Sequence, residues 1–477
     1  MSIFHYNGNM NDIKEIFSLI QNLSKEDKVL VQKAYDFALK SHEGHLRKSG
    51  EPYFNHLFGT AKNIARLGMG VATVIAGFLH DSIEDTGVTA ETIEKEFGKE
   101  ILFLVEGVTK LGKIKYHGTN RYNESLRKLF IAMSQDIRVL IIKLCDRLHN
   151  MQTLEHVPKE KQLRIAKETL EIFAPLAYRL GIKNLQRELE DLAFAYVYPK
   201  EHEEIKKILK KKKDEVEKHL DNFEKSLKKE LAKNGITEFR MDHRVKSMYS
   251  LYKKLQKYKW DVETIYDISA LRVTVKEVAD CYRILGIVHG VWRPLPGRIK
   301  DYIASPKLNG YRSIHTTIFT GDGGIIEVQI RTEEMHREAE YGVASHLTYK
   351  EGKKATNWIQ DMVDFQKEAG DDFLEHAKKD FFEERIFVFT PIGDVMDLPK
   401  DSSVIDFAYA IHSDIGDHMS GAKVNGKFTA ITTTLQNGDR VEVETKKSAK
   451  PTTKWLEYCK TTMARRRINN YLENSKT

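Results

Sequence analysis

Apolar residues in the first part of the chain recur with the period of an α-helix. Two segments, VATVIAGFLHD (71–81) and QDIRVLIIKLCDRLHN (135–150), place apolar side chains at i, i+3, i+4 and i+7. Such a stripe buries one face of a helix against its neighbours. We therefore expect an all-α domain over residues 1–155, followed by a second helical region, 156–235, that packs against it.

The second helical region is saturated with charge between residues 201 and 233, where lysines and glutamates are interleaved. The run Lys210–Lys213 has two interpretations: a nucleic-acid-binding patch, or one face of a solvated helix with acid–base pairs at i,i+4. We favour the solvated helix, because acidic residues stand on both sides of the run.

The hydrophobic period changes to two after Asp267, which predicts β-strands. Residues 271–275 and 326–331 alternate apolar and polar side chains. The sequence between them contains WRPLPGRIKDYIASPKLNGYRS, which is too irregular for one element and reads as a functional loop. We expect an α+β domain over 236–345 and a helical linker over 346–383.

A compact β-rich unit is expected over residues 384–445, because short apolar strands alternate there with turn residues. Asn425-Gly426 and Asn437-Gly438 both predict hairpin turns. The last residues, 446–477, are basic and predict the start of a further helical region.

The composition places the chain among soluble multidomain proteins. Its 477 residues exceed one hydrophobic core, and 41% are hydrophobic while 30% are charged. We find no apolar run long enough for a membrane span and no secretory pattern. The three cysteines are scattered, which indicates a reducing cytoplasm. The net charge of +7 suits phosphate-rich ligands without identifying one.

Four residues with metal-binding side chains stand near the ends of the predicted apolar helices. His80 and Asp81 end the first stripe, Asp146 lies on the second, and His56 belongs to RKSGEPYFNH. Two imidazoles and two carboxylates suit one or two six-coordinate Mn²⁺-type ions better than a closed, thiolate-rich zinc site. Such an ion activates water for phosphoryl hydrolysis.

Further charged side chains flank this set. If the first helix continues past His80, Glu84 and Asp85 lie one turn on and can act as general acid or base. Arg47 and Lys48 can hold substrate phosphates. A His-Asp pair alone is often an ordinary helix cap, but the whole spaced set is much rarer.

The motifs HEGHLRKSGEPY, FLHDSIEDT, VTKLGK, LCDRLHNM and AYRLGI resemble the HD-type phosphohydrolases, and specifically the hydrolase half of the RelA/SpoT homologue family. The resemblance implies Mn²⁺-dependent removal of the 3′-pyrophosphate from (p)ppGpp. It associates Glu84, Asp85 and Asn150 with catalysis and substrate contact. Because no residue of the pattern is replaced, it implies an active hydrolase.

The α+β region offers the parts that a pyrophosphoryl transferase needs. If their strands are neighbours, Asp267 and Glu327 can share Mg²⁺, and Glu327 can act as a general base beside Gln329. Tyr311, two residues after Asn309, can stack on a base. The side chains available for phosphates are Arg244, Lys246, Arg272, Arg298, Lys300, Lys307 and His315. The plain alternative for this pattern is a half-solvated sheet without a ligand.

A second set of motifs, HRVKSMYSLYKK, DISALRV, WRPLPGRIKDYIASPKLNGYRSIHTT, EVQIRT and AEYGVASH, resembles the synthetase half of the same family. The resemblance implies that Arg244 and Arg272 flank the adenine of ATP and that Tyr311 stacks on guanine. It also implies that Asp267 and Glu327 bind Mg²⁺ and activate the 3′-OH of GDP or GTP.

Two stretches refine this match. The tetrad RIKD (298–301) corresponds to the basic loop of bifunctional members of the family. The turn TGDGG (320–324) is spaced more loosely than expected, which leaves its geometry open.

The motifs VFTPIGDVMDLP, IDFAYAIHSDIGDHMSGAKVNGK and LQNGDRVEV resemble a TGS domain, a β-grasp module. In long family members this module contacts tRNA, and His412 stands at the implicated position. A hydrogen-bonded turn residue is the equal alternative for His412. Long members continue into further regulatory modules, so we expect this chain to lack most of that C-terminal region.

The expected protein is a cytoplasmic enzyme that makes (p)ppGpp from ATP and GDP or GTP and also hydrolyses it, as part of the stringent response. Simultaneous activities would waste ATP, so we expect mutually exclusive conformations coupled through the helices of 155–235. Two alternatives remain: a hydrolase with an inactive synthetase, and a tRNA- or ribosome-binding regulator with vestigial sites.

Overall fold

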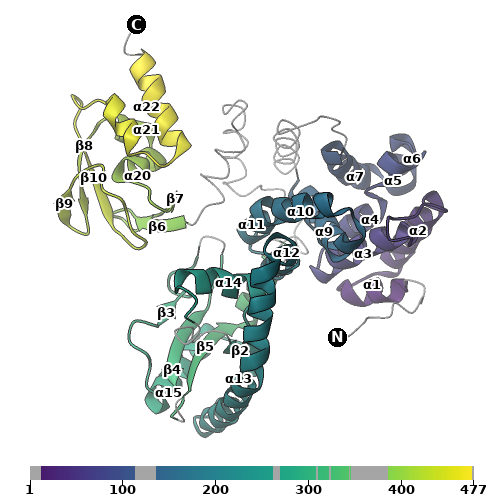
Figure 1. Ribbon diagram of the computed structural model, residues 1–477, viewed down its shortest axis with the longest axis horizontal. Coiled ribbons are helices and arrows are strands. Elements are labelled where there is room, and N and C mark those ends of the chain that lie inside the picture. The colour runs from purple at the N-terminus through teal and green to yellow at the C-terminus, as the bar shows by residue number, and fades with distance from the viewer. Residues whose placement is uncertain are drawn as a thin grey trace. The chain divides into compact units, whose positions relative to one another are not determined.

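The structure is a computed structural model that describes residues 12–112, 136–261, 269–307, 310–321, 324–342, 344 and 385–474. The chain folds into two compact units. The described residues up to 344 form the first unit, and residues 385–474 form the second (Figure 1). The helical linker expected over 346–383, together with Asp267 and Asn309, lies outside the described residues.

The beginning of the first unit is entirely helical in its described part. The helices are α1 (Ile13–Leu19), α2 (Lys25–Ser41), α3 (Phe54–Arg66), α4 (Val71–Leu79), α5 (Ser82–Asp85), α6 (Ala90–Phe97), α7 (Lys99–Gly112) and α9 (Ile137–Gln152). Both predicted apolar stripes are buried, on α4 and on α9. Gly77 lets α4 approach α3 closely, because a Cβ there would overlap the Ile64 side chain. The all-α prediction is confirmed.

The placement of Glu84 and Asp85 one turn after His80 assumed that the first apolar helix continues. The structure shows that it does not. Helix α4 ends at Leu79, and α5 starts separately at Ser82. The ring of His80 turns back, and its Nδ1 donates to the Gly77 carbonyl at 2.9 Å. The chain turns at His80 and Asp81, between the two helices.

A second group of helices leads from α9 to a β-sheet. It comprises α10 (Lys159–Glu168), the π-helical turn η2 (Thr169–Phe173), α11 (Ala174–Arg179), α12 (Lys183–Val197) and α13 (Pro199–Lys233). Helix α13 carries the charge-saturated sequence. Its outer face has acid–base pairs such as Glu224–Lys228, as predicted. Its inner face buries Leu220, Phe223 and Leu227.

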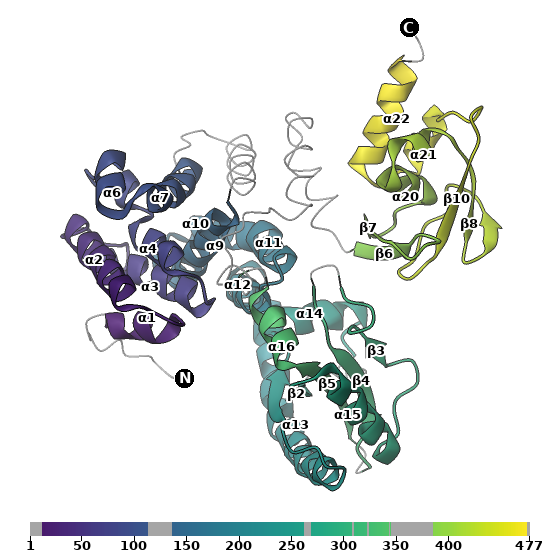
Figure 2. The same ribbon diagram turned by 180° about the vertical axis from the view of Figure 1, so that it is seen from behind.

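The sheet has the strand order β1-β2-β5-β4-β3. Strands β2, β5, β4 and β3 are labelled in Figure 2. The strands are β1 (Arg240–Val245), β2 (Ser269–Val275), β5 (Ile325–Thr332), β4 (Ile314–Phe319) and β3 (Lys300–Asp301). Strands β2 and β5 are parallel, and the other pairs are antiparallel. The predicted strands therefore exist and are neighbours.

The two faces of this sheet differ in character, because side chains alternate along each strand. Leu271, Val273 and Val328 point to one face, where α13 and α15 (Val278–Val291) cover them. Arg272 and Gln329 are opposite one another on the other face and are also buried. Helices α14 (Met248–Lys257), α16 (Glu333–Tyr341) and α12 lie near this polar face.

The second unit combines short strands with helices. It contains β6 (Arg385–Phe389), β7 (Val395–Pro399), α20 (Val404–Ile411), α21 (Ser413–Asp417), β8 (Met419–Val424), β9 (Lys427–Thr429), β10 (Val441–Thr445), η6 (Thr453–Glu457) and α22 (Thr462–Asn474). Its core includes Trp455 and Ile468 from the C-terminal segment. Helix α22 is therefore part of the same packed unit.

One of the two predicted hairpin turns is confirmed and the other is wrong. Asn425 and Gly426 have φ of +53° and +79° and join β8 to its partner β9. Gly438 has φ of +95° in a tight turn before β10, but β10 pairs with β8, which does not adjoin that turn in sequence. Asn437-Gly438 does form a turn, as its residues indicate, but the strand that follows pairs with a strand that is distant in sequence.

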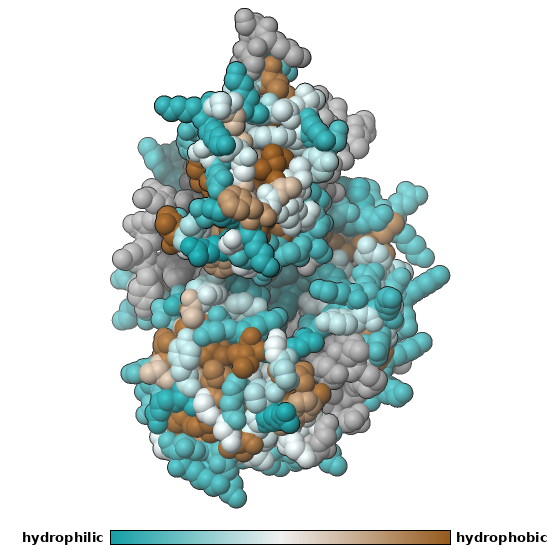
Figure 3. Space-filling view, turned by 90° about the vertical axis from the view of Figure 1, so that its left-hand side faces the viewer, coloured by the Kyte–Doolittle hydropathy of each residue, from teal (hydrophilic) through white to brown (hydrophobic). Residues whose placement is uncertain are grey.

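No helix among the described residues is long and apolar enough to cross a bilayer. On the face in Figure 3, hydrophilic residues predominate and apolar ones gather in separate patches.

We predict that Asp406→Ala destabilises the second unit. Asp406 is fully buried and accepts hydrogen bonds from Ser403, Lys460 and Thr461. Removing the carboxylate leaves several buried donors unpaired, at a cost of about 3 kcal/mol or more. Hydrogen exchange of peptides from 385–474 measures the loss. The control Asp414→Ala removes an exposed carboxylate of the same unit and should change protection little. Equal losses of protection in the two variants would contradict a stabilising role for the buried Asp406 carboxylate.

Candidate functional sites

The four predicted metal-binding residues come together in the first helical part. His56 projects from α3, His80 and Asp81 from the turn after α4, and Asp146 from α9. Ligand atoms of His56, His80 and Asp146 all lie within 4.8 Å of one another, and these three residues are buried. The Asp81 carboxylate lies 3.1 Å from His80 Nε2 and 3.6 Å from His56 Nε2. Two nitrogen and two oxygen donors thus converge, which suits a divalent cation.

The His80 ring is oriented for such a role. Its Nδ1 donates to the Gly77 carbonyl, so Nε2 faces the cluster. Nε2 is close to Asp81 but makes no hydrogen bond within the described residues. Burial lowers the pKa of His80, but Asp81 and Asp146 outweigh it and raise the pKa to about 9. A cation at this site would replace the proton on Nε2.

The Asp146 carboxylate is held by its own helix. Lys143, one turn before it, donates to Oδ2 at 2.7 Å, and Asn150, one turn after it, donates to Oδ1. Burial alone would raise the pKa of Asp146. Lys143 and the neighbouring His56 and His80 outweigh burial and hold that pKa well below its usual range. The carboxylate therefore stays ionised and fixed in direction.

His149 is a member of this cluster that the sequence analysis missed. Its Nδ1 lies 3.1 Å from both His56 Nδ1 and the Arg47 guanidinium. Burial, with the nearby His56 and Arg47, lowers the pKa of His149 to about 3, so its ring is neutral and accepts from Arg47. Its position three residues after Asp146, on the same helical face, was the available signal. Gly59 makes room for this ring, because a Cβ there would overlap His149 Cδ2.

The other residues predicted for this site border it. Arg47 also donates to Asn150 Oδ1 at 2.6 Å, so these two predicted substrate contacts meet. Lys48, Glu84 and Asp85 are exposed. Tyr53, which was not predicted, donates to the Asp81 carboxylate at 2.8 Å. The site therefore has a buried donor set with an exposed charged rim.

The polar face of the sheet holds a second constellation. His315 Nδ1 donates to the Glu327 carboxylate at 2.7 Å, and Tyr311 OH donates to His315 Nε2 at 2.7 Å. Gln329 donates to the same Glu327 oxygen at 3.3 Å. The turn before Glu327 is closed by a backbone bond from Thr320 to the Gly324 carbonyl, which keeps β5 in register with β4.

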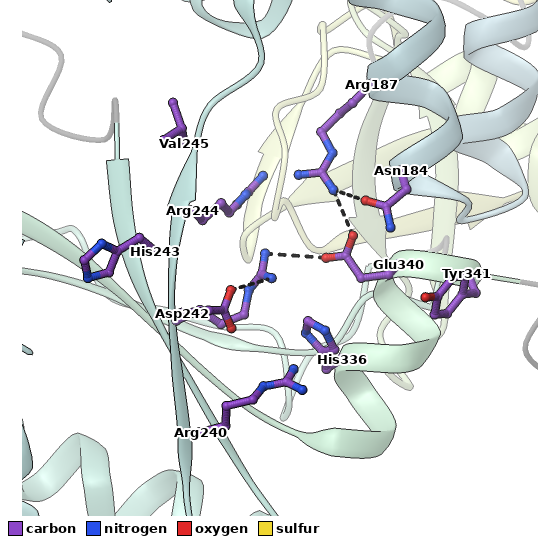
Figure 4. A pocket seen from close by; sticks show the side chains of 11 residues that line it. Asn184, Arg187, Arg240, Asp242, His243, Arg244, Val245, His336, Glu340 and Tyr341 are labelled. Atoms are coloured by element: carbon purple, nitrogen blue, oxygen red, sulfur yellow. Dashed lines mark hydrogen bonds and ion pairs between the residues drawn. The ribbon is translucent and has the colours of Figure 1, made fainter. Parts of the chain in front are cut away.

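Beside this chain of hydrogen bonds lies a cleft of ≈ 450 Å³ (Figure 4). Arg187 and Asn184 come from α12, and Glu340 comes from α16. Arg187 donates to Glu340 at 2.8 Å, and Arg272 approaches the other Glu340 oxygen at 3.4 Å. Burial raises the pKa of Glu340, but Arg187 and Arg272 outweigh it and lower that pKa.

The cleft carries an excess of positive charge. Its lining includes four arginines, Arg187, Arg240, Arg244 and Arg272, against the two carboxylates Asp242 and Glu340. A partly enclosed cavity with this balance attracts phosphate-rich anions. Arg244 and Arg272 are brought together here, as predicted, while Arg187 was not predicted, because it belongs to a helix far away in sequence.

The remaining predicted residues of this region lie on three segments: Lys246 directly after β1, Arg298 and Lys300 at β3, and Lys307 between β3 and β4. Lys307 packs against the rings of Tyr302 and Tyr311 at 4.6 and 5.5 Å. Arg298 and Lys300 are exposed, and Lys246 is half-buried.

In the second unit, His412 caps a helix. Its Nδ1 accepts from the Asp414 amide at 3.2 Å, and its ring is exposed. His412 is therefore hydrogen-bonded in a turn, as the second interpretation expected. Its exposed ring is also accessible to a binding partner.

Three family models match the chain. A model described as HD domain matches residues 34–183, one described as a region found in RelA / SpoT proteins matches 243–354, and one described as TGS domain matches 386–445. The HD match implies a divalent metal, which agrees with the cluster of His56, His80 and Asp146.

Curated relatives align with nearly the whole chain. A GTP pyrophosphokinase of Myxococcus xanthus is 45% identical over 93% of this chain and 60% of its own length. A guanosine-3′,5′-bis(diphosphate) 3′-pyrophosphohydrolase of Borreliella burgdorferi is 42% identical over 98% of this chain and 72% of its own length. The bifunctional (p)ppGpp synthase/hydrolase SpoT of Escherichia coli is 41% identical over 96% and 67%.

The chain spans only about 60% of the length of the first of these relatives. Even so, the three matched regions follow one another in the chain. The identity with the two other relatives extends over two thirds or more of their lengths. The chain belongs to the RelA/SpoT family, with an HD domain, a RelA/SpoT region and a TGS domain.

Proposed function

We propose that this chain is a bifunctional alarmone enzyme. It transfers pyrophosphate from ATP to the 3′-OH of GDP or GTP, and it hydrolyses the 3′-pyrophosphate of the (p)ppGpp that results. The observation that carries the proposal is a pair of separate sites in one unit, a donor cluster for a cation and an arginine-lined cleft for anions. Relatives named for each activity support both halves.

For hydrolysis, His56, His80, Asp81 and Asp146 would hold a divalent cation, which we propose to be Mn²⁺. When bound, such an ion lowers the pKa of a water and polarises a phosphoryl oxygen. Arg47 and Lys48 then bind phosphates of the substrate, and Asn150 orients Arg47 and contacts the substrate. Glu84 and Asp85 on the exposed rim exchange protons with the attacking water and the leaving group.

For synthesis, Glu327 serves as the general base for the ribose 3′-OH, and Glu327 and Asp267 are the residues that would hold Mg²⁺. His315 fixes the direction of the Glu327 carboxylate through its 2.7 Å hydrogen bond. Arg244 and Arg272 flank the adenine of ATP, and Tyr311 stacks on guanine. The remaining cations and polar groups, Lys246, Arg298, Lys300, Lys307, Asn309 and Gln329, hold phosphates and position both nucleotides.

We also propose that the TGS domain contacts tRNA or the ribosome through His412, and that the protein works in the cytoplasm. The exposed ring of His412 and the three unpaired cysteines support these two points.

Opposed activities in one chain need coupling, and α12 suits that role. It packs against α9, which carries Asp146, and it also contacts α14 and α16 beside the cleft. On the sheet side, Asp191 accepts from the Tyr249 amide at 2.9 Å, and Glu190 accepts from Lys253 at 3.0 Å. A shift of α12 would therefore displace elements of both the helical metal-binding cluster and the arginine-lined cleft.

We predict that Asp81→Ala abolishes (p)ppGpp hydrolysis and spares synthesis. Loss of a metal ligand should exceed the roughly 10- to 100-fold cost of losing an outer-shell partner. Chromatography of ppGpp incubated with Mn²⁺ measures hydrolysis, and incubation of ATP with GDP measures synthesis.

Glu327→Gln should have the reverse effect, because loss of a general base typically lowers the rate by about 10²- to 10⁴-fold. The same two assays apply, and each variant serves as the folding control for the other. Loss of both activities in either single variant would argue for misfolding or for one shared site.

Gly59→Ala should impair hydrolysis without removing any metal donor. The new Cβ would displace His149, and with it the neighbouring His56 and Arg47. We expect hydrolysis to fall about 10- to 100-fold, and synthesis to persist. The control Gly286→Ala adds a Cβ to an exposed helical glycine with no atom within 4 Å and should leave hydrolysis unchanged. Normal hydrolysis by Gly59→Ala would show that the position of His149 is unimportant.

A further inference from the structure

The first residue of α12 reaches into the polar face of the sheet. Lys183 places its Nζ 3.1 Å from the centre of the Tyr311 ring. Lys183 is the last residue of the HD match, whereas Tyr311 lies within the RelA/SpoT region. Tyr311 is only 3% exposed. A side chain from the hydrolase half thus covers an aromatic ring of the synthetase half.

Two further contacts hold the start of α12 in this place. Arg187, one turn after Lys183, bonds to Glu340 of α16. Gly342, just after α16, is in close backbone contact with the turn before α12. A Cβ on Gly342 would overlap the Leu180 carbonyl oxygen. The covering of Tyr311 is therefore part of a defined junction.

The Lys183 ammonium is poorly compensated at this position. Burial, with the nearby cations Lys307, Arg244 and Arg331, keeps the pKa of Lys183 well below its ordinary value, and Glu340 offsets this only in part. A cation over an aromatic face is attracted by the ring, but here it is also repelled by its neighbours. A ligand that binds the Tyr311 ring without this repulsion can therefore displace the Lys183 ammonium.

A purine base that stacks on tyrosine needs a ring face at van der Waals distance. The ammonium occupies that face. We propose that Lys183 competes with the guanine base for Tyr311, so that α12 closes the acceptor-nucleotide subsite in this conformation. The inference rests on the proposed synthetase function, in which Tyr311 stacks on guanine. Withdrawal of α12 would uncover the ring and, at the same time, move a helix packed against α9 of the hydrolase site.

Binding of a fluorescent GDP analogue to the 477-residue chain tests the proposal, together with steady-state synthesis from ATP and GDP. Lys183→Ala should tighten GDP-analogue binding and lower KM for GDP by about fivefold, the scale of a single cation–π contact. Lys183→Arg keeps a flat cation over the ring and should behave like the unchanged protein. Lys207→Ala, an exposed lysine of α13, is the matched control and should have no effect.

A double-mutant cycle shows whether the effect passes through the ring. In a Tyr311→Ala background, Lys183→Ala should no longer tighten binding, because nothing remains to be uncovered. Unchanged or weaker GDP binding by Lys183→Ala, in a variant with a normal melting temperature, would overturn the proposal and make Lys183 a bystander or a substrate ligand. The same tightening in both backgrounds would overturn it too.

The two hypotheses fail in different ways. If the chain made no (p)ppGpp but Lys183→Ala still tightened GDP binding through Tyr311, the synthetase proposal would fall and the competition would stand. If synthesis were normal and Lys183→Ala left GDP binding unchanged, only the competition would fall.

Discussion

Buried charge is the constraint on which both sites depend. Ionised groups taken out of water require partners, and the groups of each site hold one another in a defined charge state. In the helical site the carboxylates of Asp81 and Asp146 stay ionised despite burial, because histidines and Lys143 surround them. In the cleft the excess is positive. Arg331 bonds to the lining residue Glu340, and burial together with Arg272 lowers the pKa of Arg331 to about 10. The first site offers donors for a cation and the second offers arginines for phosphates, as the two halves of the proposed chemistry require.

The fold provides these charges with a rigid setting. Helices α3, α4 and α9 pack through small residues, and Gly59 and Gly77 leave no space for a Cβ. The sheet places apolar side chains under α13 and α15 and leaves polar ones on the other face.

Much of this arrangement could be predicted from local sequence. Periodicity located the helices and the alternating strands, and the motifs identified His56, His80, Asp81 and Asp146, which do converge. The spacing of residues within one element was sufficient for these predictions.

The failures have two sources. Helix α4 ends at Leu79, and the His80 ring bonds to the backbone three residues back, which a hydrophobic pattern does not register. The other failures depend on the three-dimensional arrangement, which the hydrophobic pattern of one sequence does not contain. The turn at Gly438 precedes a strand whose partner is not its neighbour in sequence. His149 and Arg187 gain their roles from residues on other helices.

The junction between α12 and α16 shows how such tertiary facts bear on function. Gly181 and Gly342 both have positive φ, at +73° and +53°, and Gly342 meets the backbone of Leu180 and Gly181 with no room for a side chain. Backbone packing of this kind does not adjust gradually, because no rotamer can change to absorb a shift. If α12 withdraws, as we propose, this backbone contact is therefore lost as a whole and is not loosened by degrees. In the structure Lys183 covers Tyr311 and is repelled by neighbouring cations. On our proposal guanine nucleotide binds once α12 has withdrawn, so its binding would favour the withdrawn position. A difference in affinity between two conformations is what a two-state switch requires.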